Sequence, residues 1–86
     1  MVDAKSQKKL DALFAERRTL QTIELGLDRR YFDAKELVTR YEKWSREGGK
    51  EDSRLQEAKK ELSRIEAEMR ENARQLNENF ERIHQV

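Results

Sequence analysis

Apolar residues recur every three or four positions along the C-terminal part of the chain. Together they form a seam that runs almost to the last residue: Leu55, Ala58, Leu62, Ile65, Met69, Leu76, Ile83 and Val86. Steps of three and four are the period of one face of an α-helix. The pattern predicts a helix over about residues 52 to 84, with two polar residues, Asn72 and Asn79, inside its apolar seam.

The N-terminal half carries a second heptad pattern. Its two rows are Leu13, Leu20, Leu27, Ala34 and Tyr41, and Leu10, Arg17, Glu24, Tyr31 and Val38. The phase does not slip at Gly26 or Asp33, where the stretch "IELGLDRRYFDAKEL" (residues 23–37) could end one helix and begin another. Because an interior glycine costs only about 1 kcal/mol relative to alanine, the pattern favours one helix over about residues 3 to 47. The alternative, a break in this stretch, would give three helices.

Gly48 and Gly49 separate the two seams and predict a turn at about residues 48 to 51. If the helices pack antiparallel around this turn, apolar residues face apolar residues in all but two layers of the seam. The polar residues of the seam then also meet in two layers: Glu24 with Asn72, and Arg17 with Asn79. Since unpaired buried polar groups are costly, we expect these two polar layers to set the register of the hairpin.

The composition agrees with this architecture. Charged residues make up 43% of the 86 residues and hydrophobic residues 35%, with three glycines and no proline. Such a mixture is typical of long exposed helices and coiled coils. The sequence therefore predicts an all-α protein, with residues 1–86 forming a single two-helix antiparallel coiled-coil hairpin. Two helices alone bury little surface, so we expect dimerisation or a partner to complete a four-helix bundle.

The charges do not indicate a nucleic-acid or membrane partner. Nineteen Lys and Arg residues are interleaved with eighteen Asp and Glu residues, which gives a net charge of +1. Nothing in this balance attracts the chain to phosphates or to an anionic surface. The longest apolar run, "ALFA" at residues 12–15, is far shorter than a membrane span. The N-terminus lacks the apolar core of a signal peptide, so we expect a cytoplasmic protein.

Few residues could support chemistry. The chain has no cysteine, no glycine-rich phosphate loop and no zinc-ligand spacing. Glu81 and His84 have the spacing of a carboxylate-bridged metal site in helical bundles, but the heptad phase places both on the outside of the helix. We therefore predict that the protein is not an enzyme, and has no catalytic residues, metal, cofactor or small-molecule substrate.

The N-terminal helix has more apolar residues than its seam uses. Ile23, Leu37 and Trp44 share one flank, opposite a polar flank of the second helix. Phe14 and Phe80 are expected to lie close together on the other flank, near the open end. A thin core with exposed apolar flanks indicates that another helical surface docks there. We predict a protein–protein interaction module, an adaptor, assembly or regulatory subunit that forms homo-oligomers or binds another helical protein.

Trp44 lies shortly before the glycines, in "WSREGG". In this respect the chain resembles the small secreted Trp-x-Gly helical-hairpin proteins. It departs from their pattern because the glycine comes two positions later and because the C-terminal "FERIHQV" lacks the family's tyrosine-plus-acid export signal. Because of the resemblance at Trp44, a secreted hairpin of that type is one alternative to the adaptor. A nucleic-acid-associated helical protein, suggested by the basic pairs along the chain, is the other alternative.

Overall fold

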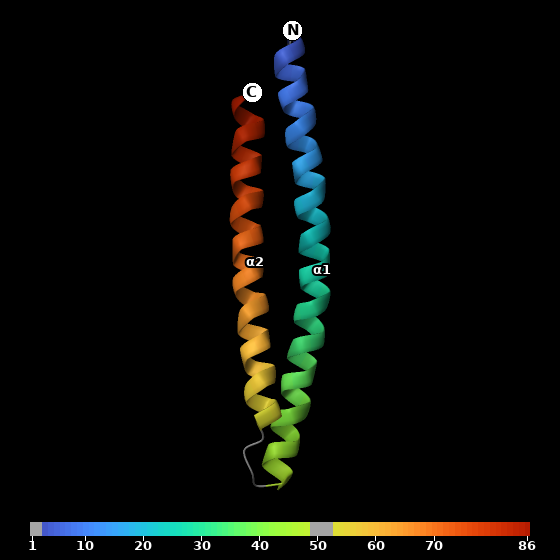
Figure 1. Ribbon diagram of the computed structural model, residues 1–86, viewed down its shortest axis with the longest axis vertical. Coiled ribbons are helices and arrows are strands. Elements are labelled where there is room, and N and C mark those ends of the chain that lie inside the picture. The colour runs from blue at the N-terminus through green and yellow to red at the C-terminus, as the bar shows by residue number, and fades with distance from the viewer. Residues whose placement is uncertain (1–2, 49–52) are drawn as a thin grey trace.

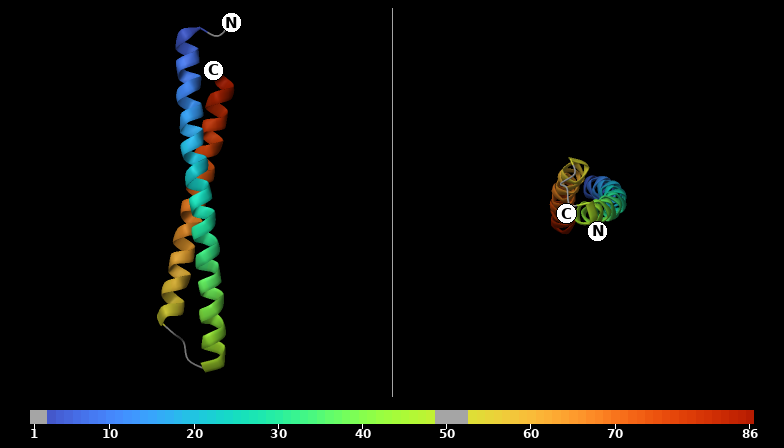
Figure 2. Two further views of the ribbon diagram at one scale, coloured as in Figure 1. Left: turned by 90° about the vertical axis from the view of Figure 1, so that its right-hand side faces the viewer. Right: turned by 90° about the horizontal axis from the view of Figure 1, so that it is seen from below.

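The computed structural model describes residues 3–48 and 53–86. Helix α1 spans Ala4–Gly48 and helix α2 spans Ser53–Gln85. The two helices pack antiparallel against each other, which confirms the predicted all-α two-helix hairpin (Figure 1). The molecule is a rod of 68 × 15 × 14 Å, and in Figure 2 α2 crosses α1 about half-way along its length. Apart from Gly48, the predicted turn lies outside the described residues.

Asp3 caps the N-terminus of α1. The Ser6 backbone N–H donates a hydrogen bond of 2.7 Å to Asp3 Oδ1, and this bond lowers the pKa of the Asp3 carboxyl. Capping satisfies one of the backbone donors that the first turn of a helix leaves unpaired. Because the pKa is lowered in the folded chain, the stabilisation is complete above the ordinary carboxyl pKa. It is lost as the pH falls through the lowered value.

The stretch that could have held a helix break is continuous. α1 passes through Gly26 without interruption. A Cβ atom placed on Gly26 would meet no atom within 4 Å, so no close approach of another segment requires glycine at this position. Glycine raises the backbone entropy of the unfolded chain and so destabilises the helix. This destabilisation is smaller than the stabilisation that the long-range packing of the seam contributes.

Replacing Gly26 by alanine is expected to raise the free energy of unfolding by roughly 1 kcal/mol, because alanine is the better helix former and the space is open. Urea or thermal unfolding followed by circular dichroism measures the change. Ala67→Gly, at an exposed position of α2, is the opposite substitution and should lower the stability by a similar amount. A Gly26→Ala variant less stable than the wild type would contradict a continuous α1.

The interior of the hairpin is formed at the predicted seam positions. Six apolar residues in the described part of the chain are buried: Leu20, Leu27, Val38, Leu55, Ala58 and Ile65. Near the turn, Val38, Leu55 and Ala58 form one cluster, against which Tyr41 and Leu62 pack. Val86, the last residue of the predicted seam, is 46% exposed. Within the described residues, neither helix has a stretch with the length and hydropathy that a membrane span requires.

Two asparagines of α2 are buried between the helices. Asn72 Nδ2 donates a 3.1 Å hydrogen bond to the backbone carbonyl of Leu20. Asn79 Nδ2 donates one of 2.9 Å to the backbone carbonyl of Leu13 and lies 3.3 Å from Glu16 Oε1. Both carbonyls belong to α1 and are seven residues apart, as the asparagines are. The two contacts therefore repeat one geometry along the seam.

Arg17 and Glu24 do not hydrogen-bond to these asparagines as simple facing pairs would. Glu24 is exposed, and Asn72 bonds instead to a carbonyl one helical turn before it. Arg17 is half-buried, and its guanidinium carbon lies 5.8 Å from the centre of the Phe80 ring. Arg17 Nη1 and Asn79 Oδ1 are both buried without a hydrogen-bond partner. The short asparagine amides reach the opposite backbone, whereas the Glu24 side chain is exposed and the Arg17 guanidinium lies against the Phe80 ring.

Candidate partner-binding surface

Ile23, Leu37 and Trp44 form a strip on one side of α1, here called the g strip. Their exposed fractions are 46%, 38% and 50%. They repeat at multiples of seven residues, so they lie on nearly the same side of the helix. The hairpin's own second helix thus leaves roughly half of each side chain in water, which is a cost that a docked apolar surface would remove.

A groove between the two helices runs beside Leu37. Its floor is apolar, formed by Leu37, Ala34, Tyr41, Ala58 and Ile65. Its rim is charged, formed by Arg30, Asp33, Arg54, Glu57, Glu61 and Arg64. An apolar floor within a polar rim is the usual composition of a protein contact surface.

Trp44 is held in place by the core. Its ring packs edge-to-face on Tyr41, with the ring centres 5.5 Å apart and the planes at 62°. Tyr41 in turn packs on the buried cluster of Val38 and Leu55. Such aromatic pairs contribute about 0.5–1.5 kcal/mol beyond the area they bury. The half-exposed indole is therefore oriented before any partner arrives, which lowers the entropy cost of binding.

Arg30 interrupts the g strip between Ile23 and Leu37, and α2 neutralises it. Arg30 Nη1 lies 3.0 Å from Glu68 Oε2 and Nη2 lies 3.6 Å from Glu61 Oε1. These pairs are exposed, so each contributes little to stability. They nevertheless compensate the charge of Arg30 within the hairpin, so a partner at this site does not have to supply a carboxylate.

Phe14 and Phe80, expected to lie together near the open end, are 46% and 51% exposed. The ring against Phe80 is that of His84, with the centres 4.1 Å apart. His84 Nδ1 also lies 3.0 Å from the Phe80 carbonyl oxygen. The ring of His84 thus packs on Phe80 from one turn further along the same helix. Among the described residues, Phe14 has no comparable ring contact.

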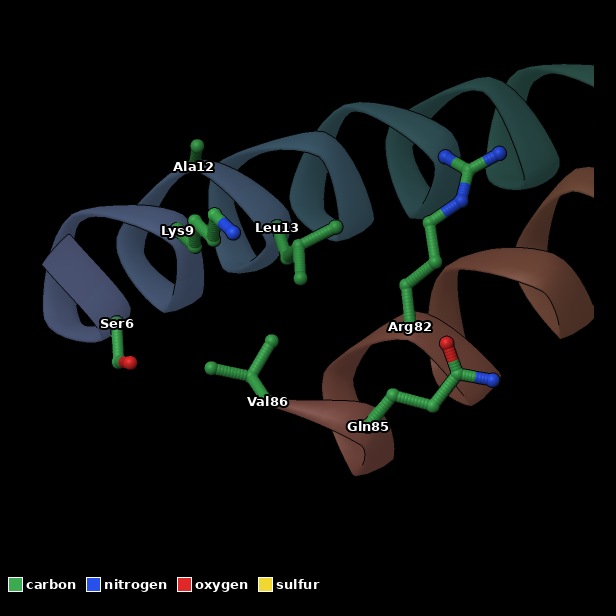
Figure 3. Close-up of a pocket in the computed structure, with 7 residues that line it drawn as sticks. All are labelled: Ser6, Lys9, Ala12, Leu13, Arg82, Gln85 and Val86. Atoms are coloured by element: carbon green, nitrogen blue, oxygen red, sulfur yellow. The ribbon is translucent and has the colours of Figure 1, made fainter.

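A further groove lies at the open end of the hairpin, between the N-terminal turns of α1 and the end of α2 (Figure 3). Leu13 and Val86 point toward each other across it, and Arg82 extends toward α1. Arg82 Nη1 lies 3.5 Å from Glu16 Oε1 of α1. The remaining lining residues are Ser6, Lys9, Ala12 and Gln85. Because it has no aromatic lining residue, this groove offers fewer anchors than the one beside Leu37, which Tyr41 also lines.

The two most exposed large hydrophobic residues were not singled out by the seam pattern. Leu25 is 70% exposed and Phe32 is 67% exposed. They lie seven residues apart on the outward face of α1, away from α2. The sequence contained a signal for them, because a second apolar repeat at a heptad position outside the seam has no reason to arise from the hairpin core.

On the charged surface, the Glu71–Arg74 ion pair shifts the pKa of both partners, lowering that of the Glu71 carboxyl and raising that of the Arg74 guanidinium. Side-chain hydrogen bonds from Arg74, and then from Gln75, hold the pKa of Glu71 at about 2. Both partners of this pair are about half exposed, so the shift reflects a surface ion pair and not a buried acid poised for catalysis. Within residues 3–48 and 53–86, no three His, Cys, Asp or Glu side chains are grouped so that they could hold a metal ion.

Comparisons with protein-family models, curated proteins and solved structures found no match to this chain. What the hairpin can do is therefore derived from its own surface. Three features of the hairpin are relevant to its function: the g strip with its groove, the outward face around Phe32, and the buried asparagines.

Proposed function

We propose that the chain is a non-enzymatic, cytoplasmic interaction module, a small adaptor or assembly subunit whose g strip binds an α-helix of a partner protein. The observation that carries the proposal is the position of Leu37 and Trp44. Both side chains are substantially exposed. Leu37 lines the groove with the apolar floor, and Trp44 packs on Tyr41, which lines the same groove. Exposed apolar patches with polar rims mark contact sites, and tryptophan is among the residues most enriched at the energetic centres of interfaces.

The chemistry of the surface suggests the kind of partner. Leu37 and Trp44 are separated by two turns, roughly 10 Å along the axis. An amphipathic helix with apolar residues at i, i+3, i+4 and i+7 covers anchors at that spacing. Charges of both signs on its edges would match Arg64 and Glu57 at the rim of the groove. If the partner helix belongs to a second hairpin, the assembly becomes a four-helix bundle.

The ion pairs favour this function over nucleic-acid binding. Arg30 and Arg64 both lie within 4 Å of Glu61 carboxylate oxygens, and Arg82 lies near Glu16 and Glu78. A phosphate would have to displace these glutamates, whereas phosphate binding gains most of its free energy from uncompensated basic side chains. With nineteen basic and eighteen acidic residues, the chain also has almost no net charge to attract a phosphate backbone.

The double substitution Leu37→Ala and Trp44→Ala is expected to weaken binding of the partner by at least about 100-fold, because truncating an interface anchor typically costs 1–2 kcal/mol or more. The partner would be isolated with the wild-type hairpin, purified, and titrated against each variant by calorimetry. The helical content of the free variant should stay near that of the wild type, since both side chains are about half exposed.

The matched control is Leu25→Ala with Phe32→Ala, which removes apolar groups of similar size from the opposite side of α1. These side chains are more exposed than those of the g strip, so a single partner helix that binds at the g strip should retain its affinity for this variant. Equal loss of affinity in both double variants, or loss only in the control, would refute the g strip as the binding surface.

A further inference from the structure

The outward face of α1 carries a line of residues that the hairpin does not cover. Leu25, Phe32 and Thr39 are seven residues apart, and the first two are 70% and 67% exposed. The Thr39 hydroxyl donates to the Lys35 carbonyl at 3.0 Å, so its polar atom is already paired. At 100° per residue, this line lies roughly 140° around the helix from the g strip. It is therefore a separate surface, here called the Phe32 face.

Charged residues flank the Phe32 face on both sides in a specific order. Asp28 and Lys35 lie on the side nearer to α2, and Arg29 and Glu36 lie on the other side. Along the chain the signs run from negative to positive on one side and from positive to negative on the other. In the part of the chain that the structure describes, none of these four residues forms an ion pair. By contrast, the neighbouring Arg30 is paired with α2.

We propose that a second copy of this chain docks on the Phe32 face with its α1 antiparallel, so that Phe32 lies on the two-fold axis. Phe32 then packs on Phe32 of the other copy, and Leu25 packs on Thr39. An antiparallel pair brings the same side of each helix together. Asp28 therefore lies beside Lys35 of the other copy, and Arg29 lies beside Glu36. The symmetry repeats every contact, which gives four ion pairs around an apolar centre.

The self-complementarity of this face is the reason to assign it to a second copy. A two-fold axis through Phe32 exchanges positions on either side of that residue, and at both flanks the exchanged charges have opposite signs. A face that binds an unrelated protein has no need for this symmetry. Complementary charges favour the correct partner and disfavour others. One helix pair with one aromatic layer is a small interface, so the dimer should be reversible.

A parallel pairing of the same two faces would also bring opposite charges together, because Asp28 would then lie beside Arg29 of the other copy. We assign the antiparallel arrangement because parallel alignment would place like ends of the two α1 helix dipoles side by side. In the antiparallel dimer both g strips point away from the contact. The dimer would thus present two partner sites, and binding to a partner with two matching helices would gain from avidity.

The experiment is sedimentation equilibrium of the purified full chain alone, over a wide concentration range. The wild type is expected to show a monomer–dimer equilibrium. Asp28→Lys should weaken the dimer at least about tenfold, because it places like charges beside each other twice. Combining it with Lys35→Asp should restore the affinity to within a few-fold, since the exchanged pair again has opposite charges. Circular dichroism confirms that each variant is as helical as the wild type.

Three results would overturn the proposal. The first is a wild type that stays monomeric at every concentration. The second is a double variant, Asp28→Lys with Lys35→Asp, that dimerises no better than the Asp28→Lys single variant. A parallel dimer predicts this second result, because it would place the introduced lysine beside Arg29 of the other copy. The third is a dimer that survives these changes but is lost when Leu37 and Trp44 are replaced by alanine. That last result would show that the chain self-associates through the g strip. It would not contradict the proposal that the g strip binds a helix.

Discussion

Replacing Ile65 by alanine is expected to lower the free energy of unfolding by about 3 kcal/mol. Ile65 is the most buried large hydrophobic residue of the hairpin, with 2% of its surface exposed. The substitution removes apolar contacts from both helices and leaves a cavity that a two-helix rod cannot close without losing neighbouring contacts. A chain with six buried apolar side chains in its described part has little stability in reserve, so the variant should be largely unfolded near 37 °C.

Ile23→Ala is the matched control because it removes the same atoms from a side chain that is 46% exposed. Its expected cost is below about 1 kcal/mol. Urea unfolding of both variants, followed by circular dichroism at the same protein concentration, measures the difference. Concentration must be held constant because association of folded chains raises the apparent stability. Similar losses at the two positions would show that the hairpin does not bury the seam at Ile65.

The helices could be predicted because their apolar repeat is long. At Gly26, local signals allowed either a helix end or a continuous helix, and the heptad phase on both sides decided correctly for one helix. Six of the predicted seam residues proved to be the buried apolar residues of the interior. Packing along a whole helix outweighs the cost of a single glycine, so a periodic pattern is more informative here than a possible capping motif.

The details of the surface were not predictable in the same way. A heptad position gives the direction in which a side chain leaves the helix, but not where a long flexible side chain ends. Glu24 lies in the seam by its position and yet is exposed. The contact between the rings of Phe80 and His84 was likewise not indicated by the heptad pattern. The seam pattern does not include Leu25 and Phe32, because they occupy a heptad position outside it.

Replacing Asn72 and Asn79 together by leucine is expected to raise the free energy of unfolding by about 2 kcal/mol. Both asparagines are buried, with 6% and 0% of their surfaces exposed, and Asn79 Oδ1 has no hydrogen-bond partner. Leucine has a similar size, removes this unsatisfied acceptor and adds apolar contact. The carbonyl oxygens of Leu20 and Leu13, which the asparagine amides now contact, can keep their bonds within α1.

The same substitutions should make the hairpin less uniform. Every heptad of α1 offers a backbone carbonyl, so the hydrogen bonds of Asn72 and Asn79 do not by themselves select one register. The register is instead selected by the residues that surround each asparagine. The Glu24 side chain is exposed, so it leaves room for a small amide in this layer of the seam. A shift of seven residues would instead place Asn72 near Tyr31 or Arg17. With leucine at both positions the amides no longer penalise such shifts, and alternative registers and oligomers approach the native state in free energy.

The measurement therefore needs two readouts on the leucine double variant. Thermal unfolding should give a higher Tm than the wild type, while sedimentation velocity and the NMR amide spectrum should show more than one species. The control is Asn72→Ala with Asn79→Ala, which removes the same hydrogen bonds but leaves the space empty and should lower the Tm. If the leucine variant melted below the wild type and remained a single species, the buried asparagines would stabilise the hairpin instead of specifying its register.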